Sequence, residues 1–151
     1  MRTAPAPRLL LPASYGCLAA RVCLSAVYLY SGIAKLIDIP AAMSEVEALG
    51  LPAPSVFLAL TILVQLGGGL LVLAGLWTRS AAFLLLGFTV VATALAHNPL
   101  GLEGVEFQRQ LTTSLEHLAI VGGFILVIAG GAGPISIDHM IEKARHGRSL
   151  T

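Results

Sequence analysis

Charged side chains are scarce in this chain. They make up 11% of its 151 residues, whereas soluble domains carry about 25%, so the chain lacks the side chains that keep a protein surface in water. No basic run is present, which argues against nucleic acid as a partner. The length is enough for one compact domain. These shortages exclude an ordinary soluble domain and leave a single membrane domain as the expectation.

Cysteine is equally scarce. The two cysteines, Cys17 and Cys23, lie six residues apart on one predicted helix, which separates them by about 9 Å along its axis. They cannot bridge each other without unwinding that helix, and they do not form a C-x-x-C motif. A thiol–disulfide mechanism resting on this chain alone is therefore not expected. Both are interpreted as small apolar residues.

Several catalytic motifs are also missing. The sequence holds no Gly-rich phosphate loop after a strand, no H-E-x-x-H and no G-x-S-x-G. Phosphate transfer, zinc proteolysis and α/β-hydrolase chemistry therefore have no support in the sequence.

Long apolar stretches are what the chain has in abundance. They cover residues 15–37, 55–76, 80–97 and 110–130. About 20 apolar residues in a helix cross the hydrocarbon core, so each stretch is a candidate span. The first stretch is too long for a signal-peptide core and predicts an uncleaved helix. The pattern predicts an all-α, four-helix membrane bundle over residues 1–151, with an N-terminal segment (1–14) and a tail (131–151).

The connections between these stretches predict two local features. Residues 40–50 begin with Pro40, end with Gly50 and carry Glu45 and Glu47, which predicts a short amphipathic helix on the membrane surface. The second and third spans are joined by so short a turn that they must be antiparallel neighbours, with Thr78 as the expected N-cap.

Basic residues are distributed unevenly between the two sides of the membrane. With four spans, both termini and the turn at Thr78 share one side. That side carries Arg2, Arg8, Arg79, Lys143, Arg145 and Arg148, and the other side carries Lys35 and Arg109. The positive-inside rule then predicts that both termini lie in the cytoplasm, with the first-loop helix outside.

Every span carries a polar stripe at helical spacing. The stripes consist of Arg21, Ser25, Tyr28, Gly32 and Lys35; Thr61 and Gln65; Thr89, Thr93 and His97; and Thr113, Glu116 and His117. Lipid cannot satisfy these groups, so they are expected to face a shared interior. A charged Arg21 or Glu116 within a span costs about 3 kcal/mol, which predicts a partner for each, with an Arg21–Glu116 interaction through Tyr28 or a water.

Polar residues gather in the outer half of the bilayer by residue count. They are Tyr28, Tyr30, Gln65, His97, Glu116 and His117. Such a cluster could bind a quinone ring through its carbonyls, or a metal, or it could be a packed interior that only fixes helix register. Haem is disfavoured because His117 is expected about two turns deeper than His97. Glu116 and His117 differ by about 100° in facing, so they cannot both aim at one atom without adjustment.

Several of these runs resemble the DoxX family. The resemblance rests on Arg21 with residues 30–38, on residues 65–70 and 75–82, on His97, and on residues 118–123 and 131–138. It implies a four-helix membrane bundle with links to redox processes, since some members are subunits of a thiosulfate:quinone oxidoreductase. Arg21, Lys35, Arg79, His97 and His117 fall where the family tends to be polar. The family often has Glu at the position of Gln65, and this departure removes a carboxylate.

The leading hypothesis is a DoxX-like protein of the bacterial inner membrane that interacts with quinone or serves as a redox-accessory subunit. Glu116 and His117 are its candidate catalytic residues, with Glu116 handling protons and His97 and His117 donating hydrogen bonds. The candidate ligand-binding residues are Arg21, Tyr28, Lys35, Gln65 and His97. Lipid is the expected environment, electrons would come from a redox partner protein, and self-association stays open. The alternatives are a scaffold for a soluble partner and a small-molecule or metal permeation protein.

Overall fold

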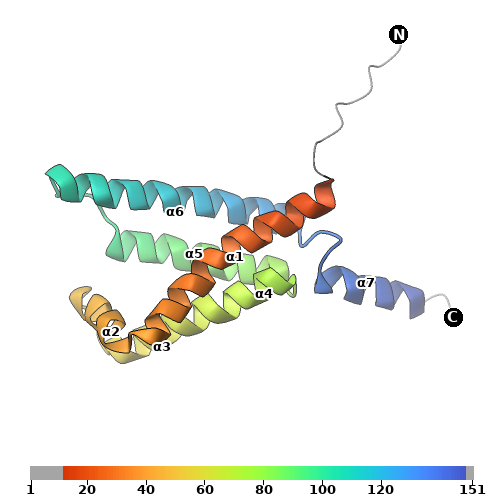
Figure 1. Cartoon of the computed structure of the whole chain (residues 1–151), viewed down its shortest axis with the longest axis horizontal. Helices are drawn as coiled ribbons and strands as arrows, with labels where there is room; N and C mark the ends of the chain where they lie inside the picture. The colour runs from red at the N-terminus through yellow and green to blue at the C-terminus, as the bar shows by residue number, and fades with distance from the viewer. Residues whose placement is uncertain (1–11, 149–151) are drawn as a thin grey trace, which may run out of the picture.

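A computed structural model describes residues 12–148, and every element in that range is helical (Figure 1). The elements are α1 (Ala13–Ile37), α2 (Ile39–Ala48), α3 (Pro54–Leu63), the π-helical segment η1 (Val64–Gly68), α4 (Gly69–Ala74), α5 (Thr78–Ala96), α6 (Gly104–Gly130) and α7 (Ile137–Arg148). The expected N-terminal segment lies, up to residue 11, outside the described residues.

Four helical stretches are long and apolar enough to cross a membrane, which confirms the expected all-α membrane bundle. They are Ser14–Ile37, Pro54–Ala74, Thr78–Ala96 and Gly104–Gly130. The fourth helix begins six residues before the apolar stretch at Gln110 does. The extra turns are polar, and an Arg109–Glu106 ion pair of 2.7 Å at i, i+3 spacing supports them. The helix therefore extends at its N-terminal end beyond the apolar stretch.

The four spans pack as a closed ring. α1 packs on η1 and α4 and on α6; α5 packs on α4 and η1 and, most extensively, on α6. Large side chains at the centre, among them Leu85 and Phe124, are fully buried. The inward side of α1 is its polar stripe, because Arg21, Ser25 and Tyr28 are all buried. The sequence expectation that this stripe faces inward is confirmed.

Close packing of the second span on α1 and on α5 depends on glycine. A Cβ at Gly32 would lie 2.7 Å from Leu66 Cδ2, and one at Gly68 would lie 2.8 Å from Leu85 Cδ2. Small residues of this kind let helix backbones approach closely within a membrane. The helix widens to π geometry at these same turns, from Val64 to Gly68. Gln65 is set into the bundle by this π segment, and such bulges are frequent at functional sites.

The bundle has two ends that differ in structure. At the α2 end, the short helix α2 packs on α3 through Ala42, Val46 and Leu58, which form a small core of their own. Asp38 caps α2 by accepting a bond from the Ala41 N–H at 3.0 Å. At the α7 end, the turn from α4 to α5 meets the loop after α6 and the start of α7. Each end has a cavity lined by polar side chains.

The N-terminus of α5 is capped by a distant residue. Thr78 was expected to be the N-cap, but this prediction is wrong: Thr78 is the first helical residue and its own side chain does not cap the helix. Asp138 of α7 instead accepts bonds from the Trp77 N–H (2.8 Å), the Thr78 N–H (2.9 Å) and the Thr78 hydroxyl (2.8 Å). A residue 60 positions away thus satisfies the free N–H groups that every helix start leaves.

Candidate functional site: a cavity at the α2 end

A cavity of about 850 Å³ opens at the α2 end of the bundle. It lies between α1, α2 and α3 on one side and α5 and α6 on the other, which diverge at this end (Figure 1). Its lining includes Leu60, Val91 and Leu95, which are 50%, 56% and 49% exposed. These apolar side chains belong to membrane-spanning helices, so the rim of the cavity lies on the lipid-facing surface.

Five of the seven sequence-predicted site residues line this cavity. They are Tyr28, Lys35, Gln65, His97 and His117. The other two, Arg21 and Glu116, do not line it. The sequence analysis therefore named five of the polar lining residues, while it missed Ser31 and Gln110, which complete two of the hydrogen-bond networks of the cavity. Ser31 lies one turn before Lys35, and that spacing was the available signal.

His117 is held by a chain of hydroxyl groups. Its Nδ1 lies 2.7 Å from Thr93 Oγ1, and that hydroxyl lies 2.7 Å from the Thr89 carbonyl oxygen. A hydroxyl has one proton, and a carbonyl can only accept, so Thr93 donates to Thr89. His117 Nδ1 must then carry the hydrogen that Thr93 accepts. We assign the neutral imidazole as the Nδ1–H tautomer, which leaves a lone pair on Nε2.

His97 is held in the same way by an amide. Its Nδ1 lies 3.1 Å from Gln110 Oε1, and Gln110 Nε2 donates to Glu106 Oε1 at 2.9 Å. The carboxylate fixes which end of the amide is nitrogen, so Gln110 Oε1 accepts from His97 Nδ1–H. Neither His97 Nε2 nor His117 Nε2 has a partner in the described chain, and neither is enclosed by protein. Both therefore present an accessible lone pair.

The two imidazoles touch each other. Their ring centroids are 5.1 Å apart in an edge-to-face arrangement. The expectation that His117 lies two turns deeper than His97 is wrong, because α6 begins at Gly104 and the turns from Gln110 to His117, not its first turns, lie level with the end of α5. The Ser114 hydroxyl donates to the His97 carbonyl oxygen at 2.5 Å and fixes this level. The depth argument against haem therefore does not hold in the folded chain.

Tyr28 forms the inner side of the site. Its hydroxyl bonds Thr89 Oγ1, and Thr89 Oγ1 donates to the Leu85 carbonyl oxygen at 2.6 Å. The proton of Thr89 is thus used, so Tyr28 is the donor to Thr89 and keeps its own lone pairs. Its ring packs against Phe88 and Phe124 at centroid distances of 6.4 and 5.5 Å. The phenol is fixed by both its ring and its hydroxyl.

Ser31 joins the polar residues of the first two spans. Gln65 Nε2 donates to Ser31 Oγ at 3.1 Å, and Lys35 Nζ donates to the same oxygen at 3.4 Å. Lys35 also forms an ion pair of 3.7 Å with Glu45 of α2. Gln65 is only 6% exposed, and its Oε1 is buried without a hydrogen-bond partner in the described chain. A buried acceptor without a partner lowers the stability of the fold, and a hydrogen-bond donor at this position would remove that cost.

Arg21 lies at the opposite end of the bundle from this cavity. It is 1% exposed, and its guanidinium donates to the carbonyl oxygens of Leu73 at 3.3 Å, of Val72 at 3.4 Å and of Ile135. The expected interaction with Glu116 is therefore wrong. Arg21 thus donates to the free carbonyl groups at the C-terminal end of α4 and in the loop before α7, and these bonds connect three segments of the fold.

Glu116 points away from the interior. It is exposed on α6 and does not line the cavity, while His117 beside it does. The inward side of α6 is occupied by residues such as Thr113, Ile120 and Phe124, and a neighbour one position away is turned by about 100°. The structure thus separates the two residues expected to act together. In the described chain, no set of three or more His, Cys, Asp or Glu residues could hold a metal ion.

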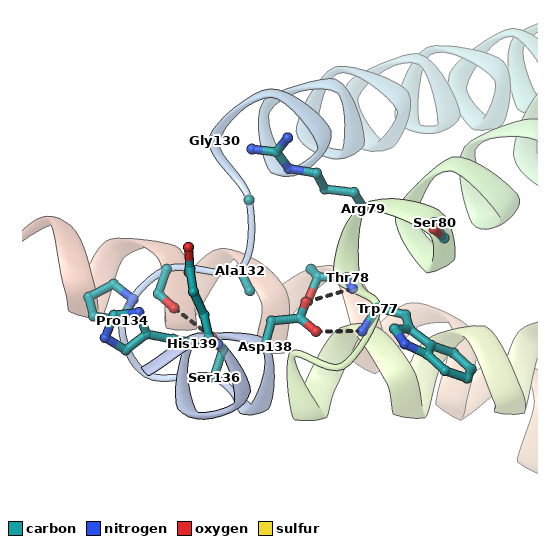
Figure 2. Close-up of a pocket in the computed structure, with 13 residues that line it drawn as sticks. Trp77, Thr78, Arg79, Ser80, Gly130, Ala132, Pro134, Ser136, Asp138 and His139 are labelled. Atoms are coloured by element: carbon teal, nitrogen blue, oxygen red, sulfur yellow. Dashed lines mark hydrogen bonds between the residues drawn. The ribbon is translucent and has the colours of Figure 1, made fainter. Parts of the chain in front are cut away.

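A second cavity of about 700 Å³ lies at the α7 end (Figure 2). Its lining includes Trp77, Arg79, Asp138 and His139. Figure 2 shows Asp138 bonded to the backbone of the α4–α5 turn, and Arg79 Nη2 lies 3.5 Å from the Ala129 carbonyl oxygen. Three donors of the turn bond this carboxylate, so Asp138 is engaged in holding α7 against the start of α5.

A model of the DoxX family matches residues 16–98, more than half of the chain. The chain belongs to the DoxX family. The match covers the helices that carry Tyr28, Lys35, Gln65 and His97, and it ends before α6 with His117. No solved structure matches the chain.

Three curated bacterial proteins are similar to this DoxX-family chain over most of its length. Inner membrane protein YqjF of Escherichia coli (strain K12) is 33% identical over 85% of the chain and 93% of its own length. Inner membrane protein YphA of the same strain is 22% identical over 80% and 86%. Uncharacterized membrane protein Rv3486 of Mycobacterium tuberculosis is 34% identical over 82% and 79%. With four apolar spans, the chain is a multi-pass protein of the bacterial inner membrane.

Proposed function

We propose that this protein binds a quinone-type headgroup in the cavity at the α2 end and serves as an accessory subunit of a membrane oxidoreductase system. The observation that carries the proposal is a cavity of about 850 Å³ with an apolar, lipid-facing rim and two histidines fixed by their Nδ1 atoms inside it. Ligand sites are typically apolar cavities with a few placed polar groups. A redox partner protein would supply or remove the electrons.

The position of the cavity suits a lipid-soluble ligand. Its rim at Leu60, Val91 and Leu95 lets an apolar tail remain in the bilayer while a polar ring reaches His97 and His117. The imidazoles, together with Gln65 and Lys35, supply the hydrogen-bonding groups that an oxygen-bearing ring needs. From the basic residues we further propose that the α7 end faces the cytoplasm, so that the ligand would bind in the opposite half of the bilayer.

Direct binding tests this function. The purified protein in mild detergent is titrated with both redox forms of a decyl-tailed benzoquinone, without oxygen, and binding is followed by calorimetry. We expect saturable binding of at least one form, and about tenfold weaker binding to His117→Ala because one hydrogen bond and its imidazole packing are lost. His139→Ala is the matched control, since His139 lines the other cavity. If neither form binds the wild-type protein, the proposed function is wrong.

A scaffold for a soluble partner is a second candidate function, and α7 is the feature that favours it. Ile137, Met140 and Ile141 lie on one side of this helix and are 39%, 69% and 39% exposed. An exposed apolar helix face of this kind commonly marks a site of contact with a partner protein. Met140→Ser is expected to reduce the recovery of a partner co-purified after chemical crosslinking in the membrane, whereas His117→Ala is not. Equal recovery with Met140→Ser would count against α7 as the docking element.

A further inference from the structure

The hydrogen-bond directions inside the cavity at the α2 end favour one class of ligand. We infer that the histidine side of this cavity selects ligands that donate hydrogen bonds, so that of the two redox forms of a quinone it binds the hydroquinone. This inference rests on the proposed function, because it concerns the redox form that the same site would bind. It follows from the acceptor to which each polar side chain donates its hydrogen bond.

Three groups in the cavity use their protons on the protein. His117 Nδ1–H is donated to Thr93, His97 Nδ1–H is donated to Gln110, and the Tyr28 hydroxyl is donated to Thr89. Each of these acceptors has its own direction fixed by a further acceptor: Thr93 donates to the Thr89 carbonyl, Thr89 to the Leu85 carbonyl, and Gln110 to Glu106. The neutral side chains of His97, His117 and Tyr28 therefore present lone pairs, and not protons, to a ligand in the cavity.

A fourth acceptor points to the same ligand chemistry. Gln65 lines the cavity, and its Oε1 is buried without a partner while its Nε2 donates to Ser31. A buried carbonyl oxygen without a donor is destabilising, and a small turn of the Gln65 side chain toward the cavity would let a ligand hydroxyl satisfy it. Lone pairs are thus presented by Gln65 on the second span, His97 at the end of the third and His117 on the fourth, while the Ser31 hydroxyl keeps a proton of its own.

Two cationic donors also line the cavity, Lys35 and Arg109, and Arg109 is paired with Glu106 at 2.7 Å. Lys35 sharpens the distinction between the two redox forms. Its side chain is 21% exposed, and its ammonium group is shared between Ser31 Oγ and Glu45. A hydroquinone oxygen can accept from Lys35 and also donate to an imidazole, because each hydroxyl both accepts and donates. A quinone oxygen can only accept, so it leaves the lone pairs of His97 and His117 unmatched. The site therefore discriminates by the proton and not by the shape of the ring.

A three-ligand comparison tests this inference. A decyl-tailed hydroquinone, the corresponding benzoquinone and the dimethyl ether of the hydroquinone are titrated into the purified wild-type protein without oxygen. The ether keeps the ring and removes both donors. We expect the hydroquinone to bind at least about tenfold more tightly than either of the others. If quinone and hydroquinone bind equally, the inference is overturned while the proposed function stands, and binding of neither overturns the proposed function itself.

Thr93 is the positioning residue to vary. Thr93→Val removes the acceptor that holds the proton on His117 Nδ1, so the imidazole becomes free to carry its proton on Nε2 and donate to a quinone. We expect the ratio of hydroquinone to quinone affinity to fall severalfold. Thr112→Val is the matched control, because Thr112 is exposed on α6 and its hydroxyl bonds only the Gln108 carbonyl oxygen of its own helix. An unchanged ratio in Thr93→Val would contradict the inference.

The tautomers can also be measured without any ligand. In protein labelled with ¹⁵N-histidine, the neutral rings of His97 and His117 are expected to give the nitrogen shifts of the Nδ1–H form, with assignments made from His97→Gln and His117→Gln. The Nε2–H form at both rings would overturn the inference. Gln110→Met, which removes the acceptor for His97, is expected to shift that ring toward Nε2–H, and this variant serves if Thr93→Val does not fold.

Discussion

Arg21→Ala is expected to lower the free energy of unfolding by about 3 kcal/mol and the melting temperature by roughly 10 °C. Arg21 is fully buried and donates to the carbonyl oxygens of Leu73 and Ile135, for which no other donor is found in the described chain. Removing the guanidinium leaves these oxygens unsatisfied and opens a void inside a helical bundle. The prediction concerns stability, because the guanidinium lies at the α7 end, away from the ligand cavity.

The space around Arg21 shows why the effect should be large. Gly75 has a φ of +70°, and a Cβ there would lie 2.0 Å from Arg21 Nη1 and 2.5 Å from Ser136 Cβ. The Gly75 carbonyl oxygen also accepts from the Asp138 N–H at 2.8 Å. The end of α4, the loop before α7 and α1 therefore meet at a point that admits no side chain. Arg21 is the polar residue that holds these three segments together.

Melting of the monodisperse protein in mild detergent, followed by size-exclusion chromatography, measures this effect. Arg79→Ala is the matched control: Arg79 is exposed and makes a single long contact to the Ala129 carbonyl oxygen, so its loss should cost less than about 0.5 kcal/mol. Ligand affinity per folded molecule should be unchanged in Arg21→Ala. A variant that melts like the wild type but loses ligand binding would return Arg21 to the binding site, where the sequence analysis had placed it.

Hydropathy predicted the architecture because the signal is strong and local. Four stretches of the required length give four spans, and the spacing of Arg21, Ser25 and Tyr28 predicted which side of α1 is buried. The ends of elements were less predictable. A polar turn such as the one with Glu106 and Arg109 continues a helix as readily as it ends one, so the start of α6 could not be read from composition.

Partners of buried polar groups could not be predicted from the sequence. The cost of a charge in a membrane requires hydrogen-bond partners for Arg21. Its partners are three backbone carbonyl oxygens and not Glu116. Such partners leave no signal in the sequence, because every residue has a backbone carbonyl. The facing of Glu116 was ambiguous for a related reason, since a helix with polar residues at two adjacent positions can turn only one of them fully inward. Packing of the neighbouring helices decided in favour of His117.

The cavity at the α2 end was predictable in several of its residues and not in its hydrogen-bond directions. His97, His117 and Gln65 could be gathered by counting residues from the membrane surface. Their roles depend on which atom bonds which neighbour, and the tautomers that we assign give each of the two histidines, expected to donate, a lone pair on Nε2. That outcome is set by Thr93 and Gln110, whose importance is visible only when the helices are side by side. Hydrogen-bond direction is a property of the fold.

Asp138→Asn is expected to destabilise the α7 end by about 1–2 kcal/mol, the cost of losing a good helix cap. Burial alone would raise the pKa of Asp138, but the bonds from Thr78 and Trp77 and the nearby charge of Arg21 hold it below the ordinary value of 3.8. An amide has one acceptor oxygen in place of two and turns an N–H toward the N–H groups of the turn. We therefore expect α7 to detach from the α4–α5 turn before the bundle melts.

The pH dependence gives this carboxylate a signature that packing alone cannot imitate. Because the folded pKa of Asp138 lies below its unfolded value, the stabilisation is complete above that unfolded value and is lost as the pH falls through the lower folded pKa. In an acid series from about pH 6 to about pH 3, protease cleavage within α7 should therefore increase in the wild type, whereas Asp138→Asn should be cleaved readily at every pH. Glu142→Gln, an exposed carboxylate on the same helix, should behave as the wild type does. Equal cleavage of wild type and Asp138→Asn at neutral pH would show that the side-chain cap does not hold α7, and the anchoring role would then rest on Arg21 and on the backbone bond from Asp138 to Gly75.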